Sequence, residues 1–247
     1  MKNLKSGSLT YGRTMCDFED GSLFFLAPNQ VASIENPKID EAQYNWGLFF
    51  HPDLLKTTSL FEKLGSFTFF GYSLNEALHL SQDEKNELTE VLRSIEKEIF
   101  RSIDKHTKPV ITSGIELLLN YCMRFYDRQF ITRSVPNRDA ISALELFLTN
   151  YFKSDLVQNG VPTVKQCATQ VNLTPNYLSD LLKKETGKST QDLIHYHVLE
   201  TAKNRLLTSN NSISQVAYSL GFEYPQYFSK LFKKKTGMSP LEYRNLN

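Results

Sequence analysis

Histidine, cysteine and hydroxyl side chains could support catalysis or bind a metal, but their spacing in this chain favours neither. The segment before residue 79 holds a single histidine, His51, and no Ser-His-Asp order or phosphate loop is visible. His195 and His197 lie two residues apart on an expected helix, which favours side chains exposed to solvent or at the rim of an interface over a metal pair. The three cysteines are far apart, which favours reduced thiols. We therefore predict no catalytic residues, no metal and no cofactor.

Lysine clusters are the second chemically active set. Lys183-Lys184 and Lys233-Lys234-Lys235 could bind phosphate groups, but they also fall in the last turns of two expected helices. Lysines are favoured there by the helix dipole alone, so both interpretations stay open. Residues 137–247 contain 13 Lys and Arg against 9 Asp and Glu, and the first 136 residues contain 15 against 18. The second part is thus the electropositive one, as a polyanionic partner would require.

These lysines belong to a segment that occurs twice. "PNYLSDLLKKETGKS", residues 175–189, and "PQYFSKLFKKKTGMS", residues 225–239, share nine identical positions. In each, a proline at the first position favours a helix start and Gly187 or Gly237 favours its end, which predicts two helices of about three turns. An apolar set marks one side of each helix: Tyr177, Leu178, Leu181 and Leu182 in the first, Tyr227, Phe228, Leu231 and Phe232 in the second.

A shorter apolar pattern precedes each copy across a sharp corner, at 171–174 and 221–224. Helix, tight turn and helix with a polar outer face is the helix-turn-helix pattern. Between the copies, "STQDLIHYHVLETAKNRLL" begins with Ser189 and Asp192 as a capping pair and carries apolar residues four apart, which predicts one connecting helix.

The blocks "LLKKETGKS", "ETAKNRLL" and "ISQVAYSLGFEYPQYFSKLFKKKTGMSPLEYR", with a supporting helix from 140 to 152, resemble the AraC/XylS family of transcription regulators over roughly the last 110 residues. The resemblance implies two helix-turn-helix units, about 163–186 and 212–236, joined by one helix. Each unit would place a recognition helix in the major groove of double-stranded DNA, about one helical turn or roughly 34 Å from the other.

The resemblance also implies which side chains face the DNA. In the first helix these are Asn176, Ser179 and Asp180, with Lys183 behind them. In the second they are Pro225, Gln226, Tyr227, Ser229 and Lys230, with Lys233 behind them. Asparagine and glutamine suit adenine, and lysine suits guanine or phosphate. Asp180 departs from the family, which frequently has a basic residue there, and "LIHYHV" replaces an arginine-rich start of the connecting helix.

The earlier residues predict an α+β organisation, with the all-α domain at 137–247. Residues 1–80 are expected to form a β-rich sensor segment, from "SLTYGRTMCDF" and "SLFFLAP" around an Asp20-Gly21 hairpin, plus "YNWGLFF". Since the family's N-terminal domain is often cupin-like, three or four strands would be a partial barrel. Residues 81–136 are expected to be helical, at 81–103 and 113–130, and to serve sensing or dimerisation.

The aromatic stripe Tyr121, Phe125, Tyr126 and Phe130 favours core or dimer packing over an effector pocket. We expect a cytoplasmic transcription regulator that binds double-stranded DNA, forms a homodimer and has no membrane partner, with RNA polymerase and a small-molecule effector as further candidate partners. The alternatives are a sensorless architectural DNA-binding protein and a cupin-type metalloenzyme fused to a DNA-binding domain.

Overall fold

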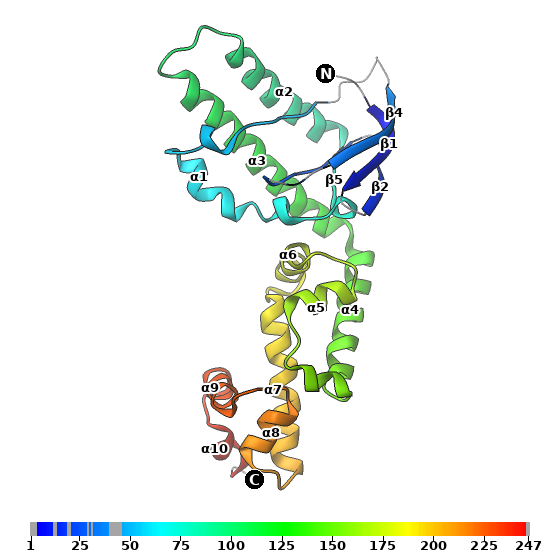
Figure 1. Cartoon of the computed structure of the whole chain (residues 1–247), viewed down its shortest axis with the longest axis vertical. Coiled ribbons are helices and arrows are strands. Elements are labelled where there is room, and N and C mark those ends of the chain that lie inside the picture. Colours follow the sequence, from blue (N-terminus) through cyan, green and yellow to red (C-terminus); the bar gives the residue numbers. More distant parts are fainter. Residues whose placement is uncertain are drawn as a thin grey trace. The chain divides into compact units, whose positions relative to one another are not determined.

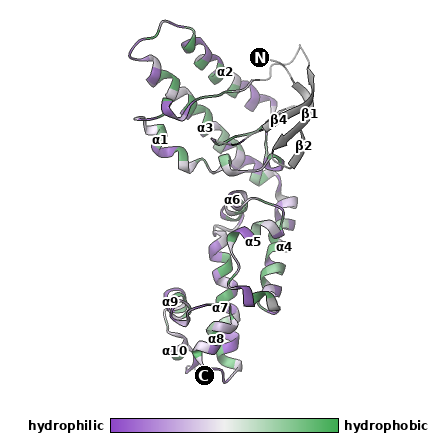
Figure 2. Ribbon diagram, in the orientation of Figure 1, coloured by the Kyte–Doolittle hydropathy of each residue, from purple (hydrophilic) through white to green (hydrophobic). Residues whose placement is uncertain are grey.

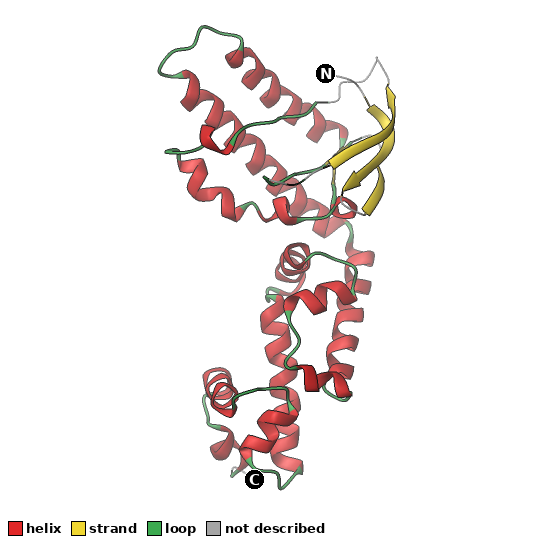
Figure 3. Ribbon diagram, viewed as in Figure 1, coloured by secondary structure: helices red, strands yellow, loops and turns green. Residues whose placement is uncertain are grey.

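The computed structural model describes residues 4–11, 14–18, 21–28, 30, 32–39 and 46–245, which are mostly helical (Figure 3). They form two compact units, 1–133 and 134–247, which are described separately below. None of the described helices is both long and apolar enough to cross a bilayer. Residues 46–77 contain short helices and 3-10 turns but no strand, so the β-rich segment that we expected over 1–80 is smaller among the described residues.

The described residues of unit one form two small sheets and three α-helices, and Figure 1 shows how these elements are arranged. The strands are β1 (Leu4–Tyr11), β2 (Thr14–Phe18), β3 (Ser22–Leu23), β4 (Ala32–Ile39) and β5 (Leu78–His79). The helices are α1 (Ser59–Lys63), α2 (Gln82–Ile99) and α3 (Thr107–Thr132), with 3-10 turns at Pro52–Leu54, Leu64–Ser66, Thr68–Gly71 and Leu74–Glu76. The partial cupin-like barrel is not supported by the strands that the structure describes.

The larger sheet has the order β2-β1-β4, with both pairs antiparallel. Leu9 is opposite Cys16 in one pair and Ile34 in the other. The β1–β4 register shifts between Ser6 and Ser8, opposite the part of β4 that contains Pro37. Proline has no N–H to donate to a neighbouring strand. A sheet therefore accommodates it on an edge strand or at an irregularity, and Pro37 has both.

Two strand predictions for the first segment are wrong. Only Ser22–Leu23 of "SLFFLAP" forms a strand, and this strand, β3, pairs with β5. Asp20, which we expected to turn a hairpin before it, lies outside the described residues. Phe25 packs its ring 4.3 Å from that of Phe69 and 6.2 Å from that of Tyr126, so the aromatic run fills a core. The described part of "YNWGLFF", residues 46–50, is not a strand, because the chain turns into the 3-10 helix that starts at Pro52.

Helix α3 organises unit one by packing along α2 and holding β5 (Figure 1). The amide of Gln129, which is 1% exposed, donates to the Ala77 carbonyl oxygen and accepts from the His79 N–H. Arg128 binds both carboxylate oxygens of Glu84, at 3.0 and 2.6 Å. Phe125, Tyr126 and Phe130 of the aromatic stripe are buried in the core, and Tyr121 is half-buried.

The two long helices of this unit, α2 and α3, differ from their predicted bounds. Helix α2 ends at Ile99, and Ile103 is 88% exposed instead of completing the apolar stripe. The Asp104 carboxylate accepts hydrogen bonds from the N–H groups of His106 and Thr107, which turns the chain into α3 six residues before the expected start. A short turn capped by the Asp104 side chain therefore forms here in place of a longer α2.

Unit two is all-helical. Its helices are α4 (Ser134–Tyr151), α5 (Val164–Gln170), α6 (Pro175–Thr186), α7 (Thr190–Thr208), α8 (Ile213–Ser219), α9 (Pro225–Thr236) and α10 (Pro240–Arg244), with a 3-10 turn at Asp155–Asn159. Figure 2 shows hydrophobic and hydrophilic residues on different sides of these helices. One continuous core joins α4 to α9 and includes Leu148, Leu178, Val198, Phe228 and Phe232.

Candidate nucleic-acid interface

The first helix pair of unit two consists of α5 and α6. Thr163 caps α5 by accepting from the Gln166 N–H, while the Gln166 side chain accepts from the Thr163 N–H at 2.8 Å. Asn172 turns the corner with φ of 55°, a left-handed value that asparagine tolerates better than most residues. Thr174 then caps α6, its hydroxyl accepting from the Tyr177 N–H. Local side chains thus cap both helices of this corner.

The second pair, α8 and α9, repeats this construction. Ser212 and Gln215 form the same reciprocal cap at the start of α8. The Phe222 N–H donates to the Ala217 carbonyl oxygen at 3.1 Å, as the Leu173 N–H donates to Ala168 at 3.0 Å in the first pair. Gly221, with φ of 87°, occupies the left-handed position. The expected pair of helix-turn-helix corners is thus present.

The repeat continues into a third helix that the sequence comparison did not include. Gly187 and Gly237 end α6 and α9 with φ of 70° and 82°, as predicted. Ser189 then caps α7 by accepting from the Asp192 N–H, and Ser239 caps α10 by accepting from the Glu242 N–H. The common spacing of Ser and an acidic residue was the available signal. Each copy is therefore three helices, and α7 is the extended third helix of the first copy.

Both second helices are fixed to the core by one side. Leu178 and Leu182 of α6 and Phe228 and Phe232 of α9 are buried in the common cluster. At 100° per residue, the direction opposite Phe228 and Phe232 in α9 is that of Lys230. Gln226, Tyr227, Lys230 and Lys233 are all exposed, while Pro225 and Ser229 are half-buried at the edge of this face. Tyr227 is 63% exposed, so our expectation that it joins the apolar set of α9 is wrong.

The predicted residues of α6 fall into two environments. Asn176 and Lys183 are exposed, whereas Ser179 and Asp180 are half-buried. The Ser179 hydroxyl lies 3.2 Å from that of Thr190, which is fully buried in the first turn of α7. Pro240 follows Ser239 as Thr190 follows Ser189, so the second copy has no equivalent hydroxyl. Ser179 is thereby placed against the connecting helix.

Helix α7 is tied to both copies. At its start, Lys235 from the end of α9 lies 2.8 Å from the Asp192 carboxylate, and hydrogen bonds from Lys235 and Ser189 lower the pKa of Asp192 to about 2. Near its end, the Arg205 guanidinium donates to the Ser219 and Phe152 carbonyl oxygens, at 2.5 and 2.7 Å. These carbonyl oxygens lie at the C-terminal ends of α8 and α4, so one side chain supplies hydrogen bonds to the ends of two helices.

The two histidines of α7 are half-buried, whereas we expected side chains that are exposed to solvent or lie at the rim of an interface. Burial lowers the pKa of His195, and the nearby ammonium of Lys235 lowers it further. Burial also lowers the pKa of His197, against the opposing effect of Glu145. Among the residues that the structure describes, no group of three or more His, Cys, Asp or Glu side chains is arranged to hold a metal.

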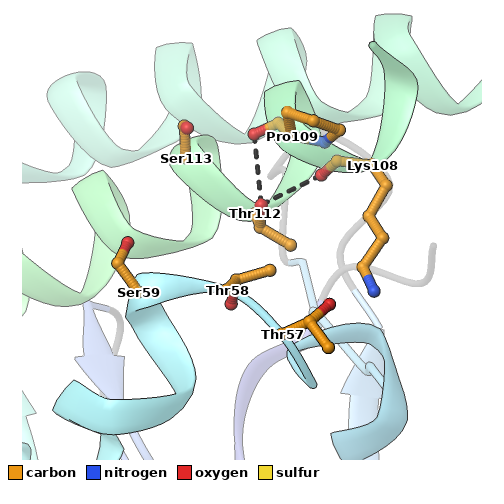
Figure 4. Close-up of a pocket in the computed structure, with 7 residues that line it drawn as sticks. All are labelled: Thr57, Thr58, Ser59, Lys108, Pro109, Thr112 and Ser113. Carbon is orange, nitrogen blue, oxygen red and sulfur yellow. Dashed lines mark hydrogen bonds between the residues drawn. The ribbon is translucent and has the colours of Figure 1, made fainter. Parts of the chain in front are cut away.

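Unit one contributes a pocket of about 340 Å³ lined by Thr57, Thr58, Ser59, Lys108, Pro109, Thr112 and Ser113 (Figure 4). Some of the hydroxyl groups that line this pocket already donate hydrogen bonds to the backbone of the chain. The Thr112 hydroxyl donates to the Lys108 and Pro109 carbonyl oxygens, and the Thr58 hydroxyl donates to that of Leu55. Thr57 has φ of 70°, which β-branched residues rarely adopt.

Residues 167–246 match a helix-turn-helix domain family, from within α5 to beyond α10. Over 83 residues the chain is 41% identical to the uncharacterized HTH-type transcriptional regulator YobQ of Bacillus subtilis, covering 34% of each chain. Over 82 residues it is 40% identical to the raffinose operon transcriptional regulatory protein RafR of Pediococcus pentosaceus. This second match covers 33% of this chain and 30% of RafR.

Residues 167–246 are a DNA-binding helix-turn-helix domain of the AraC/XylS type. The C-terminal domain of AraT, a response regulator from Geobacillus stearothermophilus, is similar with 29% identity and a TM-score of 0.39, covering 46% of this chain and 86% of that one. The chain spans about a third of the length of the curated relatives named above.

Proposed function

We propose that this chain is a sequence-specific transcription regulator that reads two successive major-groove segments, one with α6 and one with α9. The observation that carries this is the repetition of a complete three-helix unit along one connecting helix. Figure 1 shows α5 and α6 towards one end of α7 and α8, α9 and α10 towards the other. With 19 residues, α7 is about 28 Å long, which is close to the roughly 34 Å of one DNA turn.

The charge of the two outer faces supports the same function. Lys230 and Lys233 are exposed on α9 and Lys183 on α6, and lysines in these places can bind phosphate or a guanine edge. Lys235 differs because its ammonium is paired with the Asp192 carboxylate, 2.8 Å away. An architectural protein would use the same lysines without base preference.

Selection of duplexes from a random library by the full-length protein tests the proposal. We expect an enriched sequence with two specified segments separated by about 10 base pairs, centre to centre. Chromatin immunoprecipitation would then place the same sequence near promoters. Equal binding to selected and random duplexes at two salt concentrations would support the architectural alternative instead.

Unit one is proposed to mediate homodimerisation through α3. Val110, Leu117 and Ile131 are 47%, 48% and 63% exposed, and their spacings of 7 and 14 residues place them along one helical stripe. Analytical ultracentrifugation of the full chain, with and without DNA, tests this. Replacing Leu117 with Glu should shift a dimer to monomer, and a wild-type chain that is monomeric at tens of micromolar rules the dimer out.

A small-molecule effector is the other proposed modulator, and the pocket of Figure 4 favours a polar one. Thermal-shift screening of small polar metabolites tests this. A true effector should raise the melting temperature of the wild type and do so less for Lys108→Ala. Stabilisation that is equal in both proteins would place the ligand elsewhere.

A further inference from the structure

Two tyrosines lie together at the start of α9. Tyr227 is in the first turn of the helix, 63% exposed, and Tyr224 immediately precedes the helix, 47% exposed. Their ring centroids are 5.7 Å apart and their planes are at 90°, an edge-to-face contact. Such a contact restricts the orientation of a ring that would otherwise rotate freely in solvent.

The position of Tyr224 is unusual for the stability of the helix alone. It is the N-cap residue of α9, where Ser, Thr, Asp or Asn normally satisfies a backbone N–H, and its side chain makes no capping hydrogen bond. Thr174 makes that bond at the start of α6. The second copy thus gives up a capping bond and places an aromatic ring beside Tyr227. A feature that costs local stability is a candidate for function.

The surroundings of Tyr227 indicate which function. Gln226 and Lys230, one residue before and three after, are exposed on the same outer face and are suited to base edges. In helix-turn-helix proteins the first residues of the second helix contact base edges, so an aromatic ring here would lie beside the bases. The one apolar group that distinguishes a base in the major groove is the thymine 5-methyl.

We propose that Tyr227, oriented by Tyr224, packs against a thymine methyl group, so that α9 selects thymine next to the base pair contacted by Gln226 and Lys230. This inference rests on the proposed function. A phosphate contact by the Tyr227 hydroxyl is the competing role, and it would contribute affinity without sequence preference.

The test uses duplexes enriched by the full-length protein, in which each thymine of the segment assigned to α9 is replaced in turn by deoxyuridine. This change removes only the methyl group. At one position we expect wild-type affinity to fall about three- to fourfold, the loss of one buried methyl contact. Tyr227→Ala should bind the thymine and uracil duplexes equally, whereas Tyr227→Phe should keep the preference.

Tyr218 provides a matched control, because it is 58% exposed on α8 and not on α9. Tyr218→Ala should keep the thymine preference, Tyr224→Ala should reduce it, and circular dichroism should show unchanged helix content in all variants. The proposal is overturned if no uracil substitution weakens the wild type, or if Tyr227→Phe loses as much as Tyr227→Ala. If the wild type enriches no sequence at all, the proposed regulatory function fails first.

Discussion

The two three-helix copies have the same backbone plan but hold their second helices by different means. In the first copy, Thr174 caps α6 and the Ser179 hydroxyl contacts Thr190 of α7. In the second, Tyr224 leaves α9 without a side-chain cap, and Lys235 joins the end of the helix to Asp192. Both helices pack on the common core. In addition, side-chain hydrogen bonds fix α6 at its start and middle, whereas an ion pair fixes α9 at its end. The difference leaves the start of α9 available for contacts with a partner.

The two helix-turn-helix corners should differ most in how much stability is lost when alanine replaces the residue with positive φ. A Cβ on Gly221 would lie 2.6 Å from the backbone carbon of Gly160, and φ there is 87°. Gly221→Ala should therefore cost about 2–4 kcal/mol, from left-handed strain and overlap with backbone that cannot move aside. The matched change in the first copy, Asn172→Ala, should cost about 1 kcal/mol. Urea unfolding measures both, and equal losses would show that the two corners are equally packed.

The second comparison concerns charge on the outer faces, where Lys230 and Asp180 hold equivalent places. Lys230→Ala should weaken binding to a selected duplex by about 1–3 kcal/mol if the lysine contacts a base, or lower the salt slope by about one if it contacts phosphate. Asp180→Ala should leave binding to random DNA equal or stronger, since it removes a negative charge. Titrations of both variants at two salt concentrations decide this. A large loss for Asp180→Ala alone would make α6 the main source of binding energy.

The hydroxyl contact between α6 and α7 provides a smaller test. Ser179→Ala leaves the buried Thr190 hydroxyl without this partner and should cost about 1 kcal/mol of unfolding free energy. Ser229→Ala is the matched control and should cost less, because Pro240 takes the place of Thr190 in the second copy. If Ser179→Ala reduced DNA affinity but left stability unchanged, the residue would be a DNA contact, as the family resemblance implied.

A feature could be predicted from the sequence where neighbouring residues determine it, and could not where it depends on residues that are far apart in the chain. Pro175, Pro225, Gly187 and Gly237 determine helix ends through their own backbone preferences, so these bounds could be predicted. The pairing of β3 with β5 joins residues more than fifty apart, and no local pattern indicates it. The Ser179–Thr190 contact likewise depends on how two helices meet. A polar residue on a helix can face either a ligand or a neighbouring helix, and the spacing is the same for both.

The smallest expected effect is a pH dependence of the unfolding free energy that arises from the two histidines of α7. Burial and Lys235 lower the pKa of His195 below its ordinary 6.5, and burial lowers that of His197. Because the folded state disfavours the protonated forms, both histidines should leave stability unchanged above about pH 6.5 and reduce it as the pH falls below that value. Asp192, with a pKa of about 2, stays ionised throughout this range and keeps its pair with Lys235.

The urea midpoint should therefore be lower at pH 5.5 than at pH 7.5, and the double variant His195→Gln, His197→Gln should show a smaller difference. An equal drop in the double variant would assign the titration to other groups, and a higher midpoint at pH 5.5 would reverse the sign argued from burial.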